Sequence, residues 1–139
     1  IDEYMIYDGK IHGASAVLLI CSLLDEDTIR KYIQICDILG MSALVEAHDQ
    51  EEIEKAIKSG SRIIGVNNRD LKTFTVDIGN SERLRKLVPD DILFVAESGI
   101  KSNVEIERLK KANVNGVLIG ETFMKAENKK QMLQQLKGE

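Results

Sequence analysis

The chain has 139 residues, of which 43% are apolar and 30% are charged, and its formal net charge is -4. This size and composition predict one soluble globular domain and exclude a disordered chain. Acidic and basic residues are interspersed along a mildly acidic chain, so we expect neither a nucleic acid nor a membrane as partner.

Strand-like apolar runs alternate with amphipathic helical segments from one end of the chain to the other. Each run is almost continuously apolar, which is typical of parallel strands that are covered on both faces. The expected strands are residues 16–21, 43–47, 62–67, 92–97 and 116–120. The expected helices are residues 2–14, 25–40, 49–60, 79–90, 102–113 and 128–139. The 79–90 helix is expected to place Leu84, Leu87 and Val88 on one face, and Ser102 or Asn103 is expected to cap the next helix.

This alternation repeats the βα unit, whose helix is the crossover that parallel strands require. Two architectures fit it, an open doubly wound sheet and part of a (β/α)8 barrel. No GxGxxG or GxxxxGK[ST] motif follows any expected strand, which weakens the case for a nucleotide-binding open sheet.

Two cysteines, Cys21 and Cys36, lie in apolar patterns with no CxxC motif and no histidine at the spacing of a zinc site. We therefore expect two reduced, buried thiols in a cytoplasmic protein, and no metal.

Polar residues follow four successive expected strands. Ligands bind at the carboxyl ends of strands in both candidate architectures, so the repeated pattern predicts a binding or catalytic site there. The polar strand ends are Glu46, then residues 67–70, then residues 97–99, then residues 120–122.

Glu46 lies among apolar residues in "ALVEAHD". A carboxyl group that points into a barrel is costly unless it is paired or functional. A buried carboxyl also holds its proton more tightly than an exposed one, which suits it to proton transfer. The competing interpretation is a strand-end glutamate that faces solvent. His48 and Asp49 are expected to cap the following helix.

Asn67 and Arg69 are two residues apart, so in an extended segment they face the same side. An amide beside a guanidinium suits a carboxylate or phosphate ligand. The alternative is turn chemistry together with a structural salt bridge of Arg69, to Asp70 or to another residue, and we assign Asn68 and Asp70 to such a turn.

Ser98 is expected to donate a hydrogen bond to substrate, because no nucleophile-elbow motif surrounds it and no histidine follows it. Gly99 would let backbone amides approach an anion, and Gly120 precedes an expected short helix. A glycine in that place is usual for the phosphate site after strands seven and eight of a barrel. Residues 116–120 would then form strand eight and residues 16–21 strand four.

Four segments, "ALVEAHDQEE", "IIGVNNRDLKTFTVD", "FVAESGI" and "VNGVLIGETFMKA", occur in this order. Together with the opening "IDEYMIYDGKIHGASAVLLI", they closely resemble indole-3-glycerol-phosphate synthase, a phosphate-binding (β/α)8 barrel of tryptophan biosynthesis. The resemblance implies a cofactor-free reaction. It converts 1-(2-carboxyphenylamino)-1-deoxyribulose 5-phosphate to indole-3-glycerol phosphate, CO2 and water.

The resemblance also implies a role for each candidate residue. Proton transfer and catalysis fall to Glu46, Asn67 and Ser98, substrate binding to Arg69 and Glu97, and phosphate binding to Gly99, Gly120 and the Glu121 backbone. The "TFM" after Glu121 departs from the commoner "SLM", so no role is given to the Thr122 hydroxyl.

The resemblance places residues 1–139 as one domain, the C-terminal part of a barrel whose strands one to three precede Ile1. The family's acid lysine, in a "KDF" strand, and its strand-one Glu and Lys would also precede Ile1. We therefore expect this chain alone to be inactive and to associate with itself through its open sheet edges. Two other interpretations stay open: a non-catalytic phosphate-binding half-barrel, and another phosphate barrel such as phosphoribosylanthranilate isomerase.

Overall fold

The computed structural model describes residues 2–70 and 73–139, which form an opening helix, then alternating strands and helices, and a final pair of helices. The strands are β1 (Ala16–Ile20), β2 (Ser42–Ala47), β3 (Ile63–Asn67), β4 (Leu93–Glu97) and β5 (Gly116–Leu118). The α-helices are α1 (Glu3–Ile11), α2 (Glu26–Ile38), α3 (Gln50–Lys58), α4 (Gly79–Leu84), α5 (Asn103–Lys111), α6 (Glu121–Lys125) and α7 (Lys129–Lys137). A 3-10 helix, η1 (Arg85–Leu87), continues α4.

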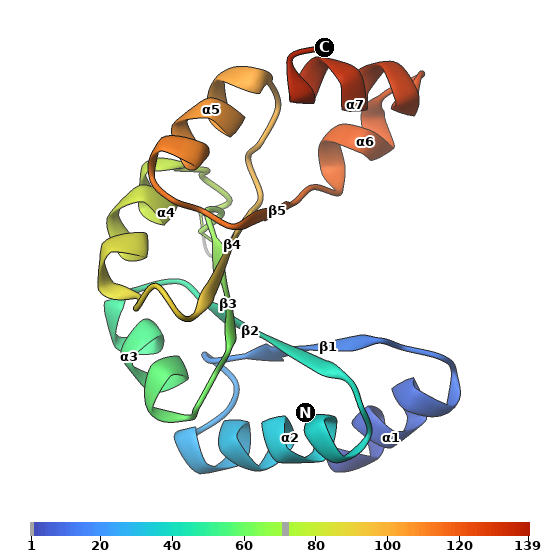
Figure 1. The fold of residues 1–139 in the computed structure, drawn as a ribbon, viewed down its shortest axis with the longest axis vertical. Coiled ribbons are helices and arrows are strands. Elements are labelled where there is room, and N and C mark those ends of the chain that lie inside the picture. The colour runs from blue at the N-terminus through green and yellow to red at the C-terminus, as the bar shows by residue number, and fades with distance from the viewer. Residues whose placement is uncertain (1, 71–72) are drawn as a thin grey trace.

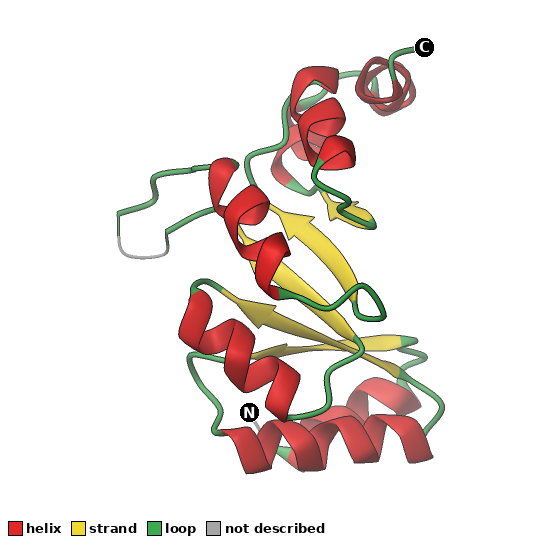
Figure 2. Ribbon diagram, turned by 60° about the vertical axis from the view of Figure 1, so that its left-hand side comes forward, coloured by secondary structure: helices red, strands yellow, loops and turns green. Residues whose placement is uncertain are grey.

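The strands form one parallel sheet in the order β1-β2-β3-β4-β5, so neighbours in the chain are neighbours in space. The sheet curls into an open arc with the strands on the inner side and α2 to α5 on the outer side (Figure 1). Figure 2 shows the same helices lying over one face of the twisted sheet. Consecutive parallel strands that curl in this way form part of a (β/α)8 barrel, as the sequence predicts.

The helix-covered face of the sheet holds the main core. Val45, Ile64, Val66 and Phe94 alternate with residues of the other face and are fully buried. They belong to one apolar cluster with buried residues of the crossover helices, so the crossovers themselves fill this face.

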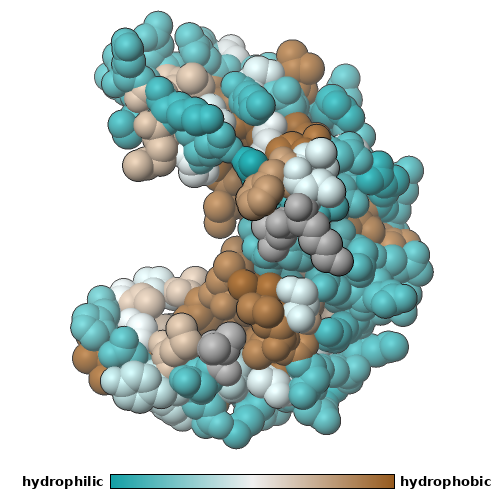
Figure 3. Space-filling view, turned by 180° about the vertical axis from the view of Figure 1, so that it is seen from behind, coloured by the Kyte–Doolittle hydropathy of each residue, from teal (hydrophilic) through white to brown (hydrophobic). Residues whose placement is uncertain are grey.

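The inner face of the sheet is open by contrast. Leu18 on β1, Leu93 on β4 and Leu118 on β5 are 48%, 49% and 48% exposed. Figure 3 shows apolar side chains gathered on the wall of the hollow between the two arms of the arc. Within the described residues, β1 and β5 each have a strand partner on one side only.

Local signals that start and stop the helices act as expected. Asp25 caps α2 by accepting from the Thr28 amide, and Asp49 caps α3 by accepting from the Glu52 amide. Ser102, rather than Asn103, caps α5 and forms a capping box with Glu105.

The two cysteines are buried as expected, because Cys21 and Cys36 are free thiols and fully buried.

Two sequence-based expectations were wrong in detail. The 116–120 strand ends at Leu118, because Leu118 pairs with the last residue of β4, Glu97, and no β4 residue remains to pair with Ile119. The 79–90 helix changes to 3-10 geometry at Arg85. The tighter turn shifts the phase of the side chains, so Leu87 is 42% exposed while Val88 is buried.

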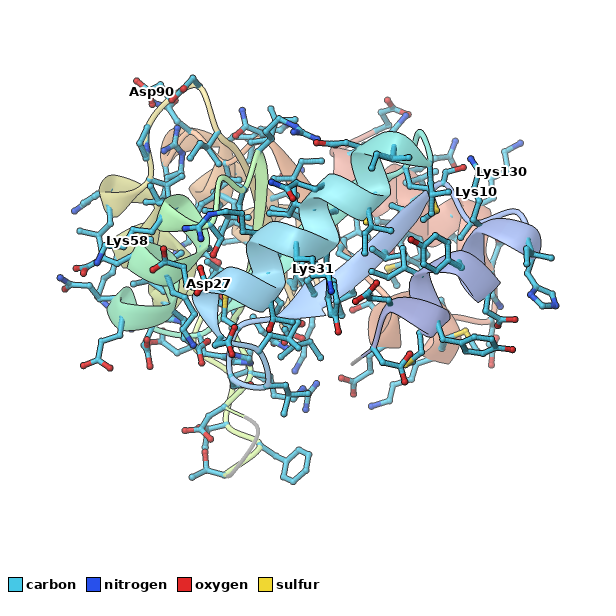
Figure 4. The ribbon with its side chains drawn as sticks, turned by 90° about the horizontal axis from the view of Figure 1, so that it is seen from below. Lys10, Asp27, Lys31, Lys58, Asp90 and Lys130 are labelled. Carbon is cyan, nitrogen blue, oxygen red and sulfur yellow. The ribbon has the colours of Figure 1, made fainter. Side chains whose placement is uncertain are left out.

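Charged side chains cover the outer surface of α2. Asp27 and Lys31 project from it away from the sheet (Figure 4), and Arg30 pairs with Asp27 on the same surface. Across residues 2–70 and 73–139, no helix combines the length and apolarity that crossing a bilayer requires.

Candidate active site

The carboxyl ends of the strands lie along one edge of the sheet, where register sets which residues are neighbours. Glu46 pairs with Gly65, and Asn67 pairs with Glu97. Gly65 and Asn67 are two residues apart on β3, so all four positions belong to the inner face of the sheet. Side chains from three strands therefore meet at this edge.

Glu46 and Glu97 form a buried pair, with only 6% and 5% of each residue exposed. The two glutamates are on β2 and β4, and β3 passes between them with Gly65 at that point. A Cβ atom on Gly65 would lie 2.1 Å from Glu97 Oε1. The missing side chain thus lets the Glu97 carboxyl group cross β3 and reach Glu46.

Burial raises the pKa of Glu97 to about 7, and the charge of Glu46 and a hydrogen bond to Glu46 act in the same direction. Glu97 Oε1 is buried and has no hydrogen-bond partner among the described residues. Two carboxyl groups in contact favour keeping one proton between them, so the pair can donate or accept a proton near neutral pH.

His48 lies beside this pair and was missed as a site residue, since it was expected only to help cap α3. Its Nε2 is 3.4 Å from Glu46 Oε1, and its Nδ1 is 3.1 Å from Glu52 Oε2. The signal in the sequence was the spacing of two between Glu46 and His48, which puts both side chains on one side of an extended segment.

Asn68 is a buried tether rather than a turn residue, which corrects the expectation from the sequence. Its side-chain amide donates to the Ser98 carbonyl at 3.3 Å, and its Oδ1 accepts from the amide and hydroxyl of Ser81 at 3.1 and 2.8 Å. Its backbone amide donates to the Glu97 carbonyl. Asn68 therefore ties the end of β3 to the end of β4 and to α4. Asp70 does take the expected turn role, because its carboxylate accepts from the Thr73 amide.

The backbone reverses sharply after β4. Ser98 has a φ of 65°, which is uncommon for a residue other than glycine, and Gly99 has a φ of 79°. The bond from Asn68 holds the Ser98 carbonyl in this conformation. A Cβ atom on Gly99 would lie 2.2 Å from Val76 Cγ1, so close packing requires glycine here as well.

Arg69 pairs with Glu121 rather than with Asp70, the partner that we considered from the sequence. Its guanidinium contacts the Glu121 carboxylate at the start of α6, and Lys125 pairs with the other oxygen of that carboxylate. The hydrogen bond from Lys125 lowers the pKa of Glu121 most, and the Arg69 hydrogen bond lowers it further. The Asn67 side chain accepts from the Arg69 amide, so Asn67 and Arg69 are locked together.

Two clefts open at this edge of the sheet. The larger, of about 580 Å³, is lined by polar side chains that include His48, Asn67, Arg69 and Asn80. The smaller, of about 250 Å³, lies against α6 and is lined by Lys101, Thr122 and Lys125 among others. Gly120 stands in open space, with no atom within 4 Å of where its Cβ would be.

A family model described as "Indole-3-glycerol phosphate synthase" matches residues 1–136. The chain belongs to the indole-3-glycerol phosphate synthase family. A relative of that name from Leuconostoc mesenteroides is 51% identical over 139 residues, which is all of this chain and 53% of that protein. Relatives from Lachnoclostridium phytofermentans and Ruminiclostridium cellulolyticum are each 56% identical over 99% of this chain and 51% and 53% of theirs.

The chain spans about half the length of the curated relatives that it matches in the indole-3-glycerol phosphate synthase family. Solved structures with low identity support the fold. KGPDC from Streptococcus mutans aligns with a TM-score of 0.72 at 14% identity, over 97% of this chain and 64% of that chain. Thiamine phosphate pyrophosphorylase from Pyrococcus furiosus aligns with a TM-score of 0.70 at 19% identity, over 90% of this chain and 58% of that chain.

Proposed function

We propose that residues 1–139 are one domain that supplies strands four to eight of an indole-3-glycerol phosphate synthase barrel, in a cytoplasmic protein. The whole protein would close the indole ring of 1-(2-carboxyphenylamino)-1-deoxyribulose 5-phosphate, with release of CO2 and water. The match to the family over residues 1–136 supports the assignment to this reaction. No cofactor is required.

The observation that carries the proposal is the buried Glu46–Glu97 pair at the mouth of the strands. In the reaction, the aromatic ring attacks the protonated ketone, the carboxylate leaves as CO2, and water is then eliminated. Glu46 takes up the proton that elimination releases. Glu97, whose pKa is about 7, lies within hydrogen-bond reach to take this proton from Glu46, so that Glu46 is a base again for the next turnover.

Three polar side chains beside the pair would bind and orient the substrate. Asn67 and Ser98 would present an amide and a hydroxyl to the substrate, and the Arg69 guanidinium would exchange its Glu121 partner for an anionic group of the substrate. Asn67 and Arg69 line the 580 Å³ cleft, which supports this part of the proposal.

The phosphate group would bind to backbone amides at Gly99, Gly120 and Glu121. The open space at Gly120 leaves room for a phosphate to approach the backbone. Lys101 and Lys125 line the smaller cleft and would balance the charge of the phosphate.

Ketone protonation needs a cation poised over the substrate, which in this family is a lysine of the other part of the barrel. We therefore expect the 139-residue chain alone to be inactive, and the chain supplied with the preceding segment of the source gene to be active. The assay is formation of indole-3-glycerol phosphate. Glu46→Gln and Glu97→Gln in the active protein should each lower kcat by roughly 100-fold or more. Turnover by the 139-residue chain alone would refute the requirement for the other part, and no turnover by the completed protein would refute the assigned reaction.

The isolated chain is also proposed to associate with itself. The half-exposed leucines of the inner face and the unpaired edges of β1 and β5 favour contact with a second copy. Light scattering should give a dimer or larger species, and a monodisperse monomer would count against this contact.

A further inference from the structure

His48 is held between two carboxyl groups from different elements. Its Nδ1 is 3.1 Å from Glu52 Oε2 on α3, and its Nε2 is 3.4 Å from Glu46 Oε1 on β2. The backbone amide of His48 donates to the same Glu52 Oε2 at 2.8 Å. Ring and backbone are therefore fixed together by one carboxylate.

The surrounding bonds determine which ring nitrogen faces Glu46. A Glu52 carboxylate can only accept a hydrogen bond, so its contact with Nδ1 favours the tautomer with the proton on Nδ1 and leaves Nε2 toward Glu46. Asp49 fixes Glu52 by accepting from its backbone amide, and Asn80 on α4 donates to the His48 carbonyl at 3.1 Å. Nε2 is buried and has no hydrogen-bond partner among the described residues, and it lies 3.4 Å from Glu46 Oε1.

We propose that His48 is a positioning residue that orients Glu46 and shares a proton with it, linking the Glu46–Glu97 pair to the 580 Å³ cleft. The step moves one proton between Glu46 Oε1 and His48 Nε2, which leaves a carboxylate and an imidazolium in one direction and restores the carboxyl and the neutral ring in the other. No electron transfer and no other reactant is involved. This inference rests on the proposed function only in giving Glu46 its place in turnover.

The charges around the ring favour this arrangement. Carboxyl groups from two elements lie beside the ring, Glu46 from β2 at 3.4 Å from Nε2 and Glu52 from α3 at 3.1 Å from Nδ1. The guanidiniums that line the same cleft are engaged elsewhere, Arg69 by Glu121 and Arg83 by Asp77. The charged residues that line the cleft with His48 are Asp49, Glu52, Arg69, Asp70, Asp77 and Arg83.

The contact can be tested without turnover, by nitrogen-15 NMR of the 139-residue chain. The chain has two histidines, His48 and His12, and His12 is exposed and far from β2 in sequence, so it serves as an internal control. We expect His48 to be the Nδ1-protonated tautomer, and Glu46→Gln to shift its Nε2 resonance while that of His12 stays in place. If Glu46→Gln left the Nε2 resonance of His48 in place, as it should leave that of His12, the contact would be overturned.

The role in turnover is tested in the completed barrel with two variants at one position. His48→Leu should lower kcat by roughly 10- to 100-fold, because Glu46 loses its orientation. His48→Gln keeps a hydrogen-bond partner for Glu46 but cannot take up a proton, so it should recover much of kcat while the pH profile of kcat changes. A His48→Leu protein with the kcat and pH profile of the parent would overturn the role. An inactive parent would instead defeat the proposed reaction, and the NMR result would still decide the contact.

Discussion

Glu97 and Glu121 are glutamates at the ends of neighbouring strands, yet their surroundings give them opposite properties. Glu97 is buried against a second carboxyl group, and its pKa is raised to about 7. Glu121 is exposed and paired with Arg69 and Lys125, and its pKa is lowered. Glu97 can exchange a proton near neutral pH, whereas Glu121 holds its negative charge to lower pH than an ordinary glutamate does.

Position at a strand end therefore does not by itself assign a chemical role to a glutamate. Burial and the sign of the nearest charge do so. Glu97 lies against another carboxyl group, which suits it to proton transfer. Glu121 lies between two cations, which suits it to joining the segment after β3 to α6 by ion pairs.

The largest effect is expected from Asn68→Ala, which removes the tether behind Glu97. The change leaves the Ser81 amide and hydroxyl and the Ser98 carbonyl without their partner, so the free energy of unfolding should fall by about 3 kcal/mol. Urea denaturation measures this loss. Asn128→Ala is the matched control, since Asn128 caps α7 at the far end of the chain, and it should cost about 1 kcal/mol. Equal losses would show that Asn68 acts as an ordinary turn residue.

Gly65→Ala should break the carboxyl pair itself. The new Cβ would lie 2.1 Å from Glu97 Oε1, so the carboxyl group must move away from Glu46. We expect a loss of about 1–3 kcal/mol in stability and a lower pKa for Glu97. Gly116→Ala is the control in the same sheet, because its Cβ would meet Val95 at an ordinary 3.8 Å. If the pKa of Glu97 were unchanged in Gly65→Ala, the Glu97 carboxyl group would not reach Glu46 by crossing β3 at Gly65.

Much of the framework could be predicted from the sequence, because strand and helix patterns are local. The five parallel strands and the burial of Glu46 are confirmed. The Glu46–Glu97 pair could not be predicted as a pair, since it depends on sheet register and on Gly65 lying between the two residues. The Arg69–Glu121 ion pair likewise joins the segment after β3 to the start of α6, which only the curl of the sheet brings together. From the sequence alone, the adjacent Asp70 was therefore the more obvious partner for Arg69.

The smallest effect is expected from Arg69→Gln, which removes one of the two cations at Glu121. The pKa of Glu121 should rise part of the way toward its ordinary value, because the larger contribution from Lys125 remains. Lys125→Gln should therefore raise it more. Carbon-13 NMR of the glutamate carboxyl carbons measures both shifts, which should weaken in high salt. A larger shift in Arg69→Gln than in Lys125→Gln would reverse the assigned order of the two cations.

A pKa of Glu97 above its ordinary value also makes stability depend on pH. Between about pH 4.5 and 7 the folded chain binds a proton that the unfolded chain has lost, so the free energy of unfolding should fall as pH rises through this range. The fall is on the order of 3 kcal/mol at most and should be absent in Glu97→Gln. Glu121 has the opposite sign, because its lowered pKa contributes stability that is lost as pH falls through the acid range.

The most direct measurement is the carbon-13 titration of the Glu97 carboxyl carbon in the 139-residue chain and in its Glu46→Gln variant. The account predicts a midpoint of about 7 in the parent chain, and a lower midpoint, still above 4.5, in the variant, since burial remains when the Glu46 charge is gone. A midpoint near 4.5 in the parent chain would contradict the buried carboxyl pair, and with it the proton exchange on which the proposed reaction depends.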